Sequence, residues 1–150
     1  MTSCQRGVKL TTVAMTSTQP LETYSIQYPA LTIKRAELAM RCLPFQLSLF
    51  AAMRTESVPL QAIAGKDGVE NHYTQRPISE LTVESGLMWL IQVGILRREV
   101  DGQGITDSFR LTPLGRQLVE KWENQGGILP PPTLLDRLYN ALSRWLRLPF

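Results

Sequence analysis

A glycine-tipped hairpin placed between two helices constrains the fold of this chain more than any other feature. Residues 94–122 read GILRREVDGQGITDSFRLTPLGRQLVEKW. Asp101-Gly102-Gln103-Gly104 supplies turn chemistry between β-prone runs, which predicts strands over 95–100 and 108–111. Thr112-Pro113 then predicts a closing helix, with threonine as the N-cap and proline at the first helical position. The segment therefore predicts a strand, a tight turn, a second strand and a helix.

Apolar periodicity predicts several helices before the hairpin. Residues 30–55 carry apolar side chains at helical spacings, and the proline inside this run predicts either two helices meeting near Leu43 or one kinked helix. Residues 60–65 are expected to form a short helix ending at a glycine, and the polar residues 66–77 a loop. The next helix begins at the N-cap Ser79 and buries a stripe made of Val83, Leu87, Leu90 and Ile91.

Composition shifts divide the chain into four parts. Residues 1–29 are rich in threonine and serine and predict a flexible N-terminal tail, followed by one folded domain over 30–125. Residues 126–132 form a Gly/Pro linker, which we expect to be extended and semi-rigid. Residues 133–150 predict an amphipathic C-terminal helix with one leucine-rich face.

Composition also limits the functional classes. The chain has 150 residues, of which 43% are hydrophobic, and this suits one modest core. Two cysteines and one histidine are too few for a disulfide framework or a structural metal site. No run approaches the roughly 20 apolar residues that a membrane-spanning helix needs, and no phosphate-binding glycine loop or nucleophile motif occurs. We therefore expect a cytoplasmic protein that is not an enzyme and that uses no cofactor or metal.

The hairpin region resembles a known family. Residues 87–120, LMWLIQVGILRREVDGQGITDSFRLTPLGRQLVE, resemble the wing region of bacterial winged-helix regulators, in which Leu-Thr-Pro-x-Gly begins the closing helix. Here that element is Leu111-Thr112-Pro113-Leu114-Gly115, and the resemblance covers about residues 35–123. The whole chain, including its LPPP spacer and terminal RLPF, also resembles a cyanobacterial family of winged-helix-like proteins. The resemblance implies a mainly α fold with a small β-hairpin: a winged helix-turn-helix domain over 30–125 plus the C-terminal amphipathic helix.

The resemblance raises the question of DNA binding. In the DNA-binding members, the helix before the wing enters the major groove. Here residues 78–96 contain no lysine or arginine but two glutamates, which would repel phosphates. We therefore interpret this helix face as a candidate protein-partner surface, made of Glu80, Glu84, Met88, Trp89 and Gln92. The alternative for Trp89 is burial against the N-terminal helix or the C-terminal segment.

Arginines near the hairpin keep DNA binding open as an alternative. If the protein binds DNA, the candidate phosphate contacts are Arg76, Arg97, Arg98 and Arg110. The other interpretation is that these arginines are solvated charges at the edges of the strands. The acidic helix before the hairpin disfavours DNA as the partner.

The C-terminal helix has three possible uses. It can fold back over its own domain, pair with a second copy or another protein, or lie weakly on an anionic membrane surface. The candidate residues for a dimer or membrane helix are Leu134, Leu138, Leu142, Trp145, Arg144 and Arg147. The favoured function is therefore a non-catalytic winged-helix adaptor that acts through protein–protein contacts or self-association. The alternatives are a DNA-binding transcriptional regulator and, more weakly, a peripheral membrane protein.

Overall fold

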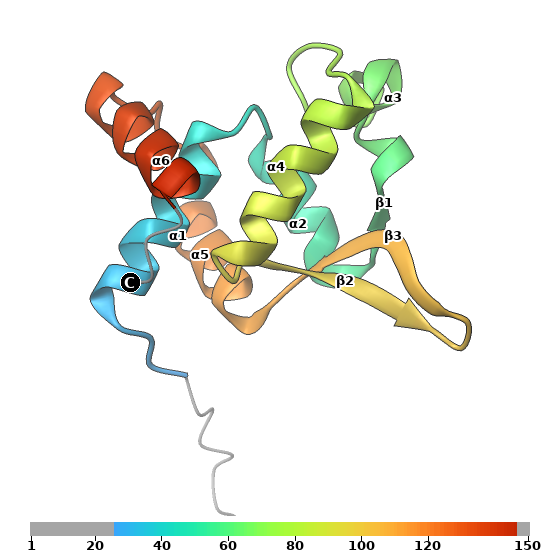
Figure 1. The fold of residues 1–150 in the computed structure, drawn as a ribbon, viewed down its shortest axis with the longest axis horizontal. Helices are drawn as coiled ribbons and strands as arrows, with labels where there is room; N and C mark the ends of the chain where they lie inside the picture. The colour runs from blue at the N-terminus through green and yellow to red at the C-terminus, as the bar shows by residue number, and fades with distance from the viewer. Residues whose placement is uncertain (1–25, 147–150) are drawn as a thin grey trace, which may run out of the picture.

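The computed structural model describes residues 26–146, and within them the chain is mainly helical with one small antiparallel sheet (Figure 1). The predicted tail falls largely on residues 1–25, and Arg147 on the last four residues; both lie outside the described part. The mainly α character with a β-hairpin that the sequence predicts is thus confirmed.

Residues 30–55 form two separate helices, which is one of the two arrangements that the sequence predicts for them. Helix α1 (Ala30–Cys42) ends before Leu43, whose backbone is extended, and α2 (Leu47–Thr55) begins three residues after Pro44. The break has a steric cause, because a proline disfavours helical backbone in the residue before it. Phe45 forms an isolated β-bridge with Thr74, which fixes the connection between the two helices.

The segment after α2 differs from the prediction. A two-residue strand β1 (Val58–Pro59) and a 3₁₀ turn η1 (Leu60–Ala62) replace the expected short helix. Gly65 adopts a φ of 61° and begins helix α3 (Gly65–Glu70), in a stretch that was expected to be a loop. Glycine supplies the positive φ that this sharp change of direction needs.

The predicted hairpin and its flanking helices form, but the return strand begins at Gly104, four residues earlier than predicted. Helix α4 (Glu80–Gln92) starts at Ser79, whose hydroxyl accepts a hydrogen bond from the backbone N–H of Thr82. Strands β2 (Leu96–Asp101) and β3 (Gly104–Leu111) pair around the tip, with Asp101 opposite Gly104. Helix α5 (Pro113–Asn124) follows, capped by Thr112. Strand β1 pairs with β3, so the sheet order is β1-β3-β2.

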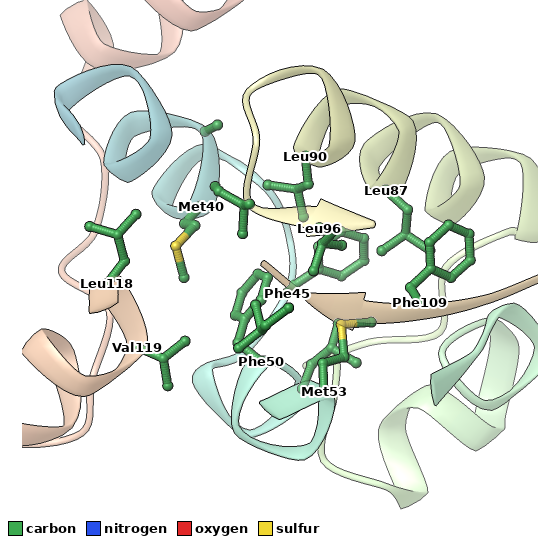
Figure 2. Packing of buried hydrophobic residues seen from close by; sticks show 14 of the residues in the cluster. Met40, Phe45, Phe50, Met53, Leu87, Leu90, Leu96, Phe109, Leu118 and Val119 are labelled. Atoms are coloured by element: carbon green, nitrogen blue, oxygen red, sulfur yellow. The ribbon is translucent and has the colours of Figure 1, made fainter. Parts of the chain in front are cut away.

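One apolar core joins these elements. Figure 2 shows side chains from α1, α2, α4, α5 and the two hairpin strands converging on it, including Met40, Phe50, Leu87, Phe109 and Val119. The predicted stripe of α4 is buried at Val83, Leu87 and Leu90 and partly buried at Ile91. The last helix, α6 (Leu134–Leu146), lies beside α1, at the end of the molecule away from the hairpin tip (Figure 1).

Candidate protein-interaction surface

Helix α6 begins with a reciprocal cap after the proline-rich linker. The backbone N–H of Asp136 donates to Thr133 Oγ1 at 3.2 Å, and the backbone N–H of Thr133 donates to the Asp136 carboxylate at 3.0 Å. Such an exchange satisfies two donors that a helix N-terminus otherwise leaves open. The hydrogen bond from the Thr133 backbone, followed by its hydroxyl and by Arg41, holds the pKa of Asp136 below its ordinary value. Asp136 is therefore an anion at neutral pH.

Arg41 of α1 binds the first turn of α6 and the linker before it. Its Nη2 donates to Asp136 Oδ2 and to the Pro131 carbonyl, both at 3.1 Å. Its Nε donates to the Pro130 carbonyl at 3.2 Å. One guanidinium group thus binds both the linker and the cap of α6, using the planar fork that arginine offers to carboxylate and carbonyl oxygens.

Trp89 of α4 fastens the middle of α6. Its Nε1 donates to Asn140 Oδ1 at 3.0 Å, and both residues are buried, at 3% and 9% exposure. On another side, the Arg35 guanidinium of α1 lies 5.4 Å from the Trp89 ring centroid. The structure therefore corrects the placement of Trp89 on an exposed partner surface: α1 and α6 cover it, as the alternative prediction had it.

Arg144 fastens the last turns of α6. Its Nη2 donates to the Ser85 backbone carbonyl at 3.0 Å and also to the Ser85 hydroxyl. Together with Arg41–Asp136 and Trp89–Asn140, this contact gives α6 three attachment points along its length, and all three are polar. Within α6, Asn140 is the only buried residue.

Helix α6 consequently turns its apolar side outward. The outer face of α6 comprises Leu134 (84% exposed), Leu135 (78%), Leu138 (57%), Tyr139 (53%), Leu142 (45%), Trp145 (87%) and Leu146 (54%). An amphipathic helix that folds back ordinarily buries its apolar stripe. A contiguous apolar patch of this kind on a folded domain marks a contact site.

Two of the three hairpin arginines, Arg98 and Arg110, lie beside carboxylates. Arg98 is 3.4 Å from Asp107 and 3.9 Å from Glu84, and it also covers the Phe109 ring at 5.5 Å. Arg110 Nε lies 3.5 Å from the Glu99 carboxylate. Glu84 thus points toward the hairpin, where it lies beside Arg98, one of the predicted phosphate contacts.

The remaining predicted site residues separate into two places. Arg97, Glu80 and Gln92 are exposed on the hairpin and α4, and Met88 is 37% exposed beside Arg98. Arg76, in contrast, lines an open groove of about 850 Å³ between the end of α1 and the linker, where Arg41 and Arg137 also lie. The structure therefore does not gather the four predicted phosphate contacts into one patch.

The described residues offer little for metal or thiol chemistry. Cys42 lines the same groove, and burial, with a further contribution from the Asp136 charge, raises the pKa of its thiol. Across residues 26–146, histidine, cysteine and carboxylate side chains form no group of three that could hold a metal ion. No helix in this range combines the length and apolar character needed to cross a bilayer.

Comparison with known proteins places the chain within a family. A family model described as Npun_F0494-like matches residues 26–144, and its cyanobacterial name agrees with the lineage that the sequence predicts. The chain matches no curated protein and no solved structure.

Proposed function

This chain belongs to the Npun_F0494-like family, and we propose that it is a non-catalytic winged-helix adaptor that acts through protein–protein contacts. The outer face of α6 is its principal contact surface. The observation that carries the proposal is the attachment of α6 by polar side chains, which leaves seven large apolar side chains in solvent. Exposing them has a free-energy cost that a partner would relieve.

The order of the elements supports the winged-helix assignment. Helices α2, α3 and α4 precede the hairpin β2–β3, and α5 closes the domain at Thr112-Pro113. The short strand β1 extends the hairpin sheet by pairing Val58 with Phe109. In this assignment α4 is the helix before the wing and β2–β3 is the wing.

The charges on α4 and the wing favour a protein partner over DNA. Glu80, Glu84, Glu99, Asp101 and Asp107 outnumber the arginines of these elements, and two of those arginines are paired with carboxylates. Each carboxylate near a phosphate adds a repulsion of roughly 1 kcal/mol or more at a protein surface. Each paired arginine also loses much of the counterion release that drives DNA binding. The transcriptional regulator thus remains the alternative function.

We expect no measurable salt-sensitive binding of the protein to random duplex DNA. Fluorescence anisotropy with a labelled duplex, at low and at physiological salt, measures this directly. A Glu84→Gln/Asp107→Asn variant, which frees Arg98, should bind the duplex more tightly than the unaltered chain if the carboxylates are what prevent binding. Micromolar affinity of the unaltered chain that collapses with added salt would favour the regulator instead.

Replacing Leu138 by glutamate is expected to abolish capture of the protein's partners. Leu138 lies at the centre of the outer face of α6, and a charge placed there must be desolvated on binding. The measurement compares material captured from native extract by the unaltered chain and by Leu138→Glu. Leu31→Glu is the matched control, because Leu31 is 73% exposed on α1, outside this face. Equal capture by all three proteins would rule out the outer face of α6 as the contact surface.

A further inference from the structure

We infer that the outer face of α6 pairs with the same face of a second copy of this chain, so that two α6 helices lie antiparallel at a two-fold interface. The inference rests on the proposed function, because it uses the same surface and names the molecule that covers it. A two-fold interface needs a patch that complements itself. The spacing, charges and area of the outer face of α6 each meet that requirement.

The apolar residues have the spacing of a helix–helix seam. Leu135, Leu138, Leu142 and Trp145 follow one another at intervals of three, four and three residues, as the a and d positions of a coiled coil do. The flanking positions nearest the seam are also apolar: Leu134, Tyr139, Ala141 and Leu146. The seam is therefore wide enough to accept a second helix along the whole of α6.

The charged residues of α6 lie away from this seam. Asp136 is bound by Arg41, Arg144 is bound by Ser85 of its own domain, and Arg137 lines the groove beside the linker. Two copies that meet through the seam consequently bring no like charges together. The contact of Arg144 weighs against a membrane surface, because an interfacial helix uses free arginines on its polar side to meet anionic headgroups. Here Asp136, Asn140 and Arg144 on that polar side contact the domain.

The exposed area suits a dimer. Each of the seven side chains of the outer face is at least 45% exposed. At roughly 100 Å² apiece they present on the order of 700 Å², close to the roughly 800 Å² that each partner buries in a standard interface. A single contact surface of this size can support a specific dimer without help from the rest of the domain.

The antiparallel direction follows from the shapes and dipoles of the two helices. In the antiparallel pair, the two helices cross at the level of Asn140 along α6. Leu138 then lies opposite Leu142 of the second copy, and Trp145 lies opposite its Leu135. Parallel pairing would instead stack two Trp145 side chains at one end and align the helix dipoles unfavourably. Because the polar contacts hold each α6 from its inner side, the two domains lie on opposite sides of the helix pair.

Sedimentation equilibrium of the unaltered chain, Leu138→Glu and Leu31→Glu tests the inference. We expect the unaltered chain and Leu31→Glu to sediment at twice the chain mass of 16.9 kDa. For Leu138→Glu we expect a dissociation constant raised at least about 100-fold, as loss of a central apolar contact predicts. Circular dichroism controls for folding, which the exposed position of Leu138 should preserve. A chain that stays monomeric at every concentration overturns the inference.

Failure of the dimer and failure of the proposed function give different results. A monomer whose capture of another protein is lost in Leu138→Glu overturns the dimer and leaves the adaptor in place. A monomer that floats with anionic vesicles, and loses this in Leu138→Glu, overturns both in favour of a membrane surface. A dimer unaffected by Leu138→Glu places the interface elsewhere and overturns the inference.

Discussion

Replacing Trp89 by alanine is expected to lower the free energy of unfolding by about 3–5 kcal/mol, the usual effect of removing a buried tryptophan. Trp89 is 3% exposed beneath α1 and α6, and its indole N–H is the hydrogen-bond partner of the buried Asn140. The substitution thus leaves both a cavity and an unpaired amide, each of which destabilises the fold. Urea unfolding followed by circular dichroism measures the loss.

Trp145→Ala is the matched control for this prediction. This substitution also removes a tryptophan side chain, but from the outer face of α6, where Trp145 is 87% exposed. At dilutions where the protein is monomeric, we expect a change within about 0.5 kcal/mol, as is usual for exposed positions. A larger loss for Trp145→Ala than for Trp89→Ala would contradict the burial of Trp89 between α1 and α6.

Replacing Gly115 by alanine should destabilise the fold by about 3 kcal/mol or more, at the upper end of overpacking effects. A Cβ at this position would lie 2.5 Å from the Ile95 carbonyl oxygen and 2.7 Å from Leu111 Cδ2. The carbonyl belongs to the backbone where α4 leads into the hairpin, so it cannot move without shifting β2 away from α5. Thermal unfolding of the variant measures the effect.

Gly102→Ala serves as the comparison within the same hairpin. A Cβ there meets nothing within 4 Å, and Gly102 is not among the glycines with a positive φ. We expect its stability to stay within about 0.5 kcal/mol of the unaltered chain. If Gly115→Ala is equally mild, the close approach of α5 to the hairpin is absent in solution.

The hairpin and its flanking helices could be predicted because their signals are local. Asp-Gly at the tip, Thr-Pro at the start of α5 and Ser79 at the start of α4 act within a few residues, and each appears in the structure at its predicted place. Gly115 could be named from the resemblance alone. The need for a glycine there comes from a tertiary contact, because the Ile95 carbonyl lies where a Cβ would be.

Strand β1 and helix α3 could not be predicted because they depend on distant contacts. Val58–Pro59 is too short to show strand periodicity and becomes a strand by pairing with Phe109 and Ser108. Helix α3 has a polar sequence, and Gly68 fits it because its missing side chain admits the Ile63 carbonyl. Hydrophobic periodicity, which is read over a short stretch of sequence, cannot predict either of these contacts.

The sequence predicted α6 but not which side of it would meet the domain. Its apolar stripe is the natural candidate for burial, whereas the structure docks the side that carries Asp136, Asn140 and Arg144. Those three residues lie four residues apart, a spacing that places them on one side of a helix. Their partners Arg41, Trp89 and Ser85 are distant in sequence, so only the folded chain reveals the match.

The indole N–H resonance of Trp89 reports on the polar attachment of α6, because Asn140 of α6 accepts its hydrogen bond. Heteronuclear NMR resolves the indole N–H groups of the chain's three tryptophans. We predict that Asn140→Ala shifts the Trp89 indole signal and speeds its hydrogen exchange, whereas Leu138→Ala leaves it unchanged, because Asn140 accepts the Trp89 hydrogen bond and Leu138 faces solvent. The opposite pattern, a Trp89 signal that responds to Leu138→Ala but not to Asn140→Ala, would mean that α6 docks through its apolar side and has no outward face to offer a partner.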